Sequence, residues 1–162
     1  MNTEDGAKSE IVRSSGLNLQ EFCNMKQLYK LLDHWSKSCG MATMIVDNEG
    51  NQVSEDFGMT EFCKVVQSCA NGKKCCKDTW KSNISGIYEC PLGFRDFSIP
   101  IVLPDGQMLG KVLAGQALSV NQKNEEILKK TSEHGIDTNA IKDALFRVHK
   151  KPILKCRAHA LC

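Results

Sequence analysis

The chain has 162 residues, 41% of them hydrophobic, which suits one domain with a substantial core and is short for two. With 21 Lys and Arg against 19 Asp and Glu, the net charge of +2 excludes a general electrostatic attraction to nucleic acid or to an anionic membrane. The polar first ten residues do not fit a secretory signal, and the longest apolar stretch is too short to cross a bilayer, so we expect a soluble, cytoplasmic protein.

The first part of the chain divides into a polar lead and a helix. Residues 1–16 are polar and rich in Ser and Gly, and we expect them to form a flexible lead before a folded domain over residues 17–150. From residue 19 to residue 38 the apolar positions recur at three- and four-residue spacing, which predicts an amphipathic helix that ends at Gly40.

A strand and two short helices are expected next. The apolar run 41–46 predicts a strand. A Gly-containing turn follows it, and residues 52–54 are expected to form a short antiparallel partner strand. Thr60 can cap a helix, and Asn71-Gly72 is expected to end it before a second helix that runs towards residue 84.

The second half predicts strands followed by helices. A short strand at residues 87–90 precedes a hairpin of residues 94–103 and 107–118. Asn121 and Asp137 can each cap a further helix. The predicted fold class is therefore α+β, with a PAS- or GAF-like antiparallel sheet of about five strands and helices on one side.

Nine cysteines are the most unusual feature of the composition, and without an export signal they favour reduced thiols, metal binding or redox chemistry over a disulfide scaffold. Five of them lie in one segment: Cys63, Cys69, Cys75, Cys76 and Cys90. Three predicted elements carry these thiols, so they could converge and bind a soft metal such as zinc, copper(I) or an iron–sulfur cluster. Simple packing of half-buried thiols and reversible redox chemistry are the alternatives.

A polar amide in an apolar strand marks a second candidate feature. Gln116 follows Gly115 in the predicted strand, and if buried it needs a hydrogen-bonding partner, which makes it a candidate pocket wall. If the strand instead ends at Gly115, the amide points into solvent. The tail at residues 151–162 has ligand-like residues, Cys156, His159 and Cys162, but no fourth ligand nearby, so metal binding there is not favoured.

Several segments, in their order and spacing, resemble the PocR sensory domain over about residues 19–150. These segments are Phe62-Cys63, residues 72–78 (GKKCCKD), residues 88–93 (YECPLG), Ile99-Pro100-Ile101, and residues 109–116 (LGKVLAGQ). The resemblance implies a PAS-like cytoplasmic ligand-binding domain of bacterial signalling proteins, which senses small hydrocarbon derivatives such as short diols. It also implies a fused output domain, either DNA-binding, histidine kinase or cyclic-dinucleotide.

The resemblance assigns roles to individual residues by position. Cys63, Cys76 and Cys90 match the recurrent thiols of the family, and Gly115 and Gln116 match its Gly-Gln strand end. Cys75 forms an unusual doublet with Cys76, so either of the two could face the site. The chain ends at Cys162 with no output domain after the last predicted helix, so we expect a fragment or a stand-alone sensor.

We therefore predict a non-enzymatic sensor domain that binds a small molecule, forms a homodimer or is fused to an output domain, and binds neither nucleic acid nor membrane. The predicted ligand contacts are Cys63, Cys76, Cys90, Tyr88, Phe97, Gly115 and Gln116. The predicted metal ligands are Cys63, Cys76 and Cys90, with Cys75 or Cys69 as alternates, and the metal would be zinc or an iron–sulfur cluster.

The alternative function is a thiol redox switch that pairs Cys63 with Cys76 or Cys90. It requires low thiol pKa values, which nearby lysines could provide: Lys64, Lys73, Lys74 and Lys77. A cysteine-dependent enzyme is not favoured, because no histidine lies in the cysteine segment to act as its base.

Overall fold

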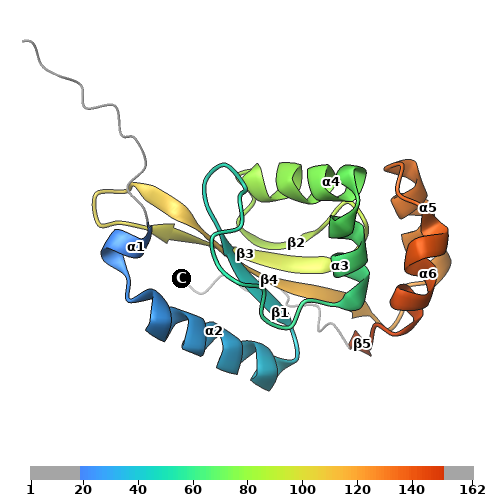
Figure 1. The fold of residues 1–162 in the computed structure, drawn as a ribbon, viewed down its shortest axis with the longest axis horizontal. Helices are drawn as coiled ribbons and strands as arrows, with labels where there is room; N and C mark the ends of the chain where they lie inside the picture. Colours follow the sequence, from blue (N-terminus) through green and yellow to red (C-terminus); the bar gives the residue numbers. More distant parts are fainter. Residues whose placement is uncertain (1–18, 152–162) are drawn as a thin grey trace, which may run out of the picture.

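A computed structural model describes residues 19–151, so the expected N-terminal lead and residues 152–162 of the tail lie outside the described residues. The described elements follow one another in this order (Figure 1): α1 (Leu19–Phe22), α2 (Met25–Cys39), β1 (Ala42–Val46), α3 (Glu61–Ser68), α4 (Ala70–Lys81), β2 (Gly86–Glu89), β3 (Arg95–Val102), β4 (Met108–Ser119), α5 (Asn124–Glu133), α6 (Thr138–Phe146) and β5 (Lys150–Lys151). The predicted α+β class and five-stranded sheet are confirmed. Within residues 19–151 no helix is both long and apolar enough to cross a membrane.

The sheet pairs strands that are distant in sequence. Its order is β1-β4-β3-β2 with antiparallel neighbours, and the short β5 pairs with β4 in parallel. The expected return strand at residues 52–54 is wrong, because only an isolated bridge joins Gln52 to Val46. The turn itself forms, since the Asp47 carboxylate accepts hydrogen bonds from the backbone N–H groups of Glu49 and Asn51. All five residues of β1 are buried, and β4 supplies the long partner that covers them.

Local capping residues fix most helix ends where they were expected. Gly40 ends α2 in the left-handed region at φ 61°, Thr60 accepts a hydrogen bond from the Cys63 N–H, and Asp137 caps α6. Asn24 divides the predicted helix 19–38 into α1 and α2, because its side chain caps a new helix by accepting from the Gln27 N–H.

Two expected boundaries are wrong. Helix α5 begins at Asn124, and its N-cap is Lys123, two residues after the expected cap at Asn121. Asn71-Gly72 does not end a helix either, because both residues lie inside α4. A Cβ atom at Gly72 would overlap the carbonyl oxygen of Val66 and lie 2.8 Å from its carbonyl carbon and Cγ1. Glycine is therefore required there by the close approach of α3 and α4.

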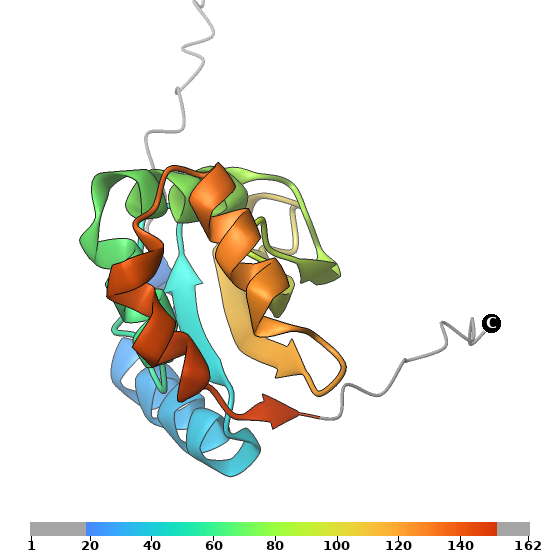
Figure 2. The same ribbon diagram turned by 90° about the vertical axis from the view of Figure 1, so that its right-hand side faces the viewer.

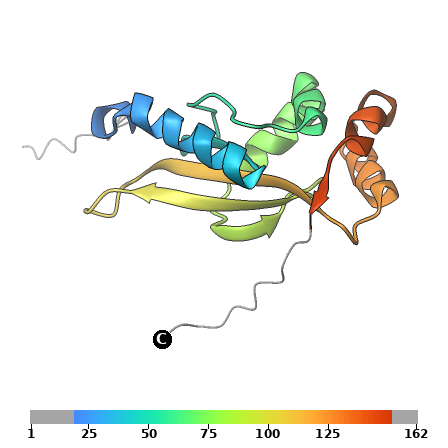
Figure 3. The same ribbon diagram turned by 90° about the horizontal axis from the view of Figure 1, so that it is seen from below.

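The helices cover both faces of the sheet. Met44 and Leu113 form one buried pair with Trp80 of α4, whereas the next pair along the strands, Ile45 and Val112, packs against α2. Because successive strand residues point to opposite faces, α4 and α2 pack on opposite faces of the sheet (Figure 2). Helices α5 and α6 lie beyond one end of the strands (Figure 3). The expected placement of helices on one side thus holds for α3 and α4 and does not hold for α2.

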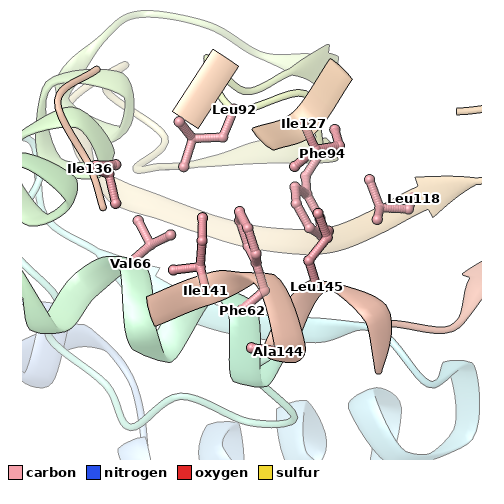
Figure 4. Packing of buried hydrophobic residues seen from close by; sticks show 10 residues of the cluster. All are labelled: Phe62, Val66, Leu92, Phe94, Leu118, Ile127, Ile136, Ile141, Ala144 and Leu145. Atoms are coloured by element: carbon pink, nitrogen blue, oxygen red, sulfur yellow. The ribbon is translucent and has the colours of Figure 1, made fainter. Parts of the chain in front are cut away.

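The largest core cluster joins α3, α5 and α6 to one end of the sheet (Figure 4). At its centre the rings of Phe62 and Phe94 stack with their centroids 4.7 Å apart. Ile127 of α5 and Leu145 of α6 close this cluster, so the loop before β3 is held from both sides.

A buried lysine fixes the end of α4 to the sheet. The Lys111 side chain of β4 donates hydrogen bonds to the backbone carbonyl oxygens of Trp80, at 3.0 Å, and Ser82. A cation at a helix C-terminus satisfies carbonyl groups that have no partner inside the helix. The position of α4 over the sheet is therefore set at both ends, by Gly72 and by Lys111.

Candidate functional site

A cavity of about 50 Å³ lies between the sheet and the helices α3 and α4, and we call it the inner cavity. Its wall is mainly apolar, with thiols and a few polar side chains. The side chains or backbone of these residues line it: Ala42, Thr43, Met44, Phe62, Cys63, Val66, Gln67, Cys75, Cys76, Thr79, Trp80, Tyr88, Cys90, Pro91, Leu92, Phe94, Asp96, Leu113, Ala114, Gly115 and Gln116.

The three thiols predicted to meet do line this one cavity. Cys63 comes from the first turn of α3, Cys76 from the middle of α4, and Cys90 from the loop that follows β2. A tight turn holds Cys90 in place, because its N–H donates to the Phe94 carbonyl and its own carbonyl accepts from the Gly93 N–H, both at 2.8 Å. Three elements from one stretch of the chain, residues 63–90, therefore bring these cysteines to a common wall.

The two spare thiols differ in position. Cys75, one residue before Cys76 on α4, also lines the inner cavity but faces a second, outer space as well. Cys69 does not line the cavity, and its thiol donates to the Val66 carbonyl at 3.2 Å. Both members of the Cys75-Cys76 doublet thus face the site.

Burial keeps the cavity thiols in their neutral form. Desolvation raises the pKa of Cys76 and of Cys90 to about 12 and that of Cys63 well above its usual value. The nearby Asp96 carboxylate adds to the rise for all three thiols. Reactive cysteines need the opposite shift, because the thiolate is the nucleophile and the metal ligand.

The arrangement does not fit the predicted metal centre. Across residues 19–151, no group of three or more His, Cys, Asp or Glu side chains is placed so that it could hold a metal ion. The candidate ligands Cys156, His159 and Cys162 lie outside the described residues.

An acidic side chain that the sequence did not single out lies among the thiols. Asp96 on β3 is half-buried in the cavity wall, and desolvation raises the pKa of its carboxyl group to about 6. Its Oδ1 accepts a hydrogen bond of 2.6 Å from the backbone N–H of Gln116, which opposes the rise. A polar residue between apolar strand positions is a weak signal on its own, and the strand pairing is what places Asp96 opposite Tyr88.

The Gly115-Gln116 strand end forms part of the cavity, as predicted. Gly115 has φ 141°, and a Cβ there would lie 2.6 Å from the Arg95 carbonyl oxygen, the Asp96 Cα and the Asp96 Oδ1. Gln116 adopts φ 55° and turns its side chain towards α3, where Oε1 accepts from the Thr60 N–H at 2.8 Å and from the Thr60 hydroxyl at 3.1 Å. Strand β4 continues to Ser119, so the amide does not point into solvent.

The two aromatic residues of the predicted site lie on different faces of the sheet. Tyr88 lines the inner cavity, and burial raises the pKa of its phenol. Phe97 is not among the lining residues, because it alternates with Asp96 along β3 and therefore points to the other face of the sheet. There its ring packs edge-on against Trp35 of α2, with centroids 5.8 Å apart.

Comparison with known proteins gives a family for this arrangement. Residues 8–160 match the sensory domain found in PocR. The chain belongs to the PocR sensory-domain family. It is 31% identical over 101 residues to the regulatory protein PocR of Salmonella typhimurium, a match that spans 57% of this chain and 33% of that relative. No solved structure matches the chain significantly. The resemblance to the PocR domain predicted from sequence is therefore confirmed.

Proposed function

We propose that this PocR sensory domain binds a small, neutral molecule with hydroxyl groups, such as a short diol, in the inner cavity. The observation that carries the proposal is the position of Asp96, a carboxylate in the cavity wall with a raised pKa and a backbone N–H as its partner. A ligand hydroxyl that donates to this carboxylate would relieve its desolvation, because a buried charge is stabilised by hydrogen bonds.

The charges of the cavity wall support a neutral ligand. Asp96 is the only acidic residue among the lining residues, and none of them is Lys or Arg. An anionic ligand would therefore meet a like charge without a compensating cation.

The size of the cavity supports a ligand of a few heavy atoms. A water-sized group needs roughly 10 to 15 Å³ of such space, so about 50 Å³ accommodates three to five of them. Apolar side chains form most of the wall, and the polar groups of Asp96, Tyr88 and Gln116 contribute to it at separate points. This pattern of an apolar wall with a few polar anchors is typical of small-molecule sites.

Thermal unfolding with a matched pair of probes tests this proposal. 1,2-Propanediol and lactate have the same carbon skeleton, and lactate carries a carboxylate where the diol carries a hydroxymethyl group. We expect the diol, at about 100 times its Kd, to stabilise the domain by about 2.7 kcal/mol, and lactate to have no effect.

Two variants with the same substitution serve as controls. Cys76→Leu fills the inner cavity and should abolish the response to the diol, whereas Cys23→Leu replaces a half-buried thiol in the cluster under α2 and should keep it. Stabilisation by lactate but not by the diol, or an equal diol response in both variants, would contradict the proposal.

We further propose that the domain works as a non-catalytic sensor in the cytoplasm, within a bacterial transcription regulator. The matched PocR relative is named a regulatory protein, and this chain covers a third of its length, which leaves room there for other domains. A fused output domain or a second copy of the chain would receive the signal, because ligand binding can shift the packing of α3 and α4 against the sheet.

A thiol redox switch is the second candidate, and one observation favours it: Cys63, Cys76 and Cys90 line a common cavity and are all free. The electrostatics do not support it. The four lysines expected to activate the thiols are exposed, and three of them bind elsewhere: Lys64 to Glu61, Lys74 to Asp78 and Lys77 to Asn51. Neutral thiols of high pKa oxidise slowly, so the diol sensor is the stronger candidate.

A further inference from the structure

A second, larger space adjoins the inner cavity. This outer cleft has a volume of about 400 Å³ and opens to solvent between the end of α4, strand β2 and the end of α5. Three residues line both spaces: Cys75, Thr79 and Pro91. The two spaces therefore adjoin at these three residues, and we call this part of the wall the neck.

The exposure of the cavity wall also points to the neck. Pro91 is the only residue lining the inner cavity that is exposed to solvent, and the others are buried or half-buried. Cys75 and Thr79 lie one helical turn apart on α4, and the Thr79 hydroxyl donates to the Cys75 carbonyl at 2.9 Å. One wall of the neck is thus a regular helix and the other is the proline of the Cys90–Phe94 loop.

We propose that small molecules reach the inner cavity from the outer cleft through the neck, and that Thr79 and Cys75 set the size of the molecule that passes. The inference adds a route and a size limit to the proposed sensing function. The route itself depends only on the geometry of the two spaces, so it can be tested without the sensed ligand.

The outer cleft is not expected to select molecules by their charge, because its acidic side chains are paired with cations. Asp78 pairs with Lys74 at 2.7 Å, and Glu89 pairs with Lys130 at 2.5 Å and with Arg95 at 3.4 Å. Both carboxylates of the cleft therefore have cationic partners. The inner cavity would then select molecules by charge, and the neck would select them by width.

The rate at which reagents modify Cys90 tests the route, because Cys90 lines the inner cavity and not the outer cleft. Methyl methanethiosulfonate and benzyl methanethiosulfonate share one chemistry and differ in size. Site-resolved mass spectrometry follows both reagents, with the exposed Cys39 as internal reference in every sample.

Three variants test the route: one narrows the neck, one widens it, and one leaves it unchanged as a control. Thr79→Phe narrows the neck and should slow methyl modification of Cys90 at least tenfold relative to Cys39. Thr79→Ala widens it and should speed benzyl modification several-fold. Ile84→Phe adds the same ring elsewhere in the outer cleft and should change either rate less than twofold.

The three variants together decide the matter. Equal Cys90 rates in Thr79→Phe, Thr79→Ala and wild type would overturn the route, as would a loss in Ile84→Phe as large as that in Thr79→Phe. Because no diol is used, the expected rates would stand even if 1,2-propanediol failed to bind, and the proposed ligand alone would then be wrong.

Discussion

Replacing Gly72 by alanine is expected to lower the free energy of unfolding by about 2 to 3 kcal/mol, which corresponds to a fall in Tm of roughly 5 to 10 °C in a domain of this size. The added Cβ would overlap the Val66 carbonyl oxygen. The backbone of α4 fixes the position of this Cβ, and the carbonyl oxygen belongs to the backbone of α3, so no side-chain rotation relieves the contact and α3 must move away from α4. Alanine is favoured over glycine in a helix by about 1 kcal/mol, and the overlap is expected to exceed this gain.

An exposed neighbour on the same helix is the control for this variant. Lys73→Ala should change the free energy of unfolding by less than about 0.5 kcal/mol, as is usual at exposed helix positions. A Gly72→Ala protein that melts at or above the wild-type temperature would show that the two helices are not in the close contact described. Because α3 and α4 both line the inner cavity, Gly72→Ala should also weaken the response to 1,2-propanediol.

Replacing Asp96 by asparagine is expected to stabilise the unliganded domain at pH 7 by about 1 to 3 kcal/mol and to weaken its response to the diol. Burial raises the pKa of this carboxyl group from 3.8 to about 6, so its ionised form opposes folding at neutral pH. Asparagine removes the charge and keeps an oxygen that can accept from the Gln116 N–H. It weakens the anchor for a ligand hydroxyl, because hydrogen bonds to a charged acceptor are roughly twice as strong.

The pH dependence of this stabilisation follows from the direction of the pKa shift. Below about pH 3 the carboxyl group is protonated in both the folded and the unfolded chain, and wild type and Asp96→Asn should be equally stable. As the pH rises from 3.8 towards the folded-state pKa of about 6, the unfolded chain ionises while the folded chain stays protonated, so the wild type loses stability and the gap opens; above that pKa the gap levels off. Thermal unfolding of both proteins between about pH 3 and pH 7 measures it.

An exposed aspartate on α6 is the control for loss of charge. Asp143→Asn should show a small difference from wild type that does not depend on pH in this way. A destabilised Asp96→Asn at pH 7, or an undiminished diol response, would contradict the role assigned to Asp96.

Local chemistry allowed much of the fold to be predicted. Thr60, Asp137 and Gly40 mark helix ends through their own side chains or backbone freedom, and such signals need no knowledge of distant contacts. Asn71-Gly72 has the same local appearance as a helix end, and only the approach of α3 explains why the helix continues. Pairing of β1 with β4 rather than with residues 52–54 likewise depends on burial of both faces of the strand, which short-range patterns do not show.

The sequence predicted the thiols of the candidate site and missed one of its polar groups, Asp96. Cys63, Cys76 and Cys90 were placed on three predicted elements, and the packing of α3, α4 and the loop after β2 brings them to one cavity. Phe97 and Asp96 are neighbours on one strand and point to opposite faces; Phe97 was expected to contact the ligand, whereas Asp96, which was not singled out, lines the cavity. Strand register, which is not visible in a single strand, decides between them.

Titration of the Asp96 carboxyl group by NMR, with and without saturating 1,2-propanediol, tests the central claim most directly. The account predicts a pKa of about 6 for this group in the free domain, and a lower pKa once ligand hydroxyls donate to the carboxylate. A pKa close to 3.8 in the free domain, or a pKa that the diol leaves unchanged, would contradict it.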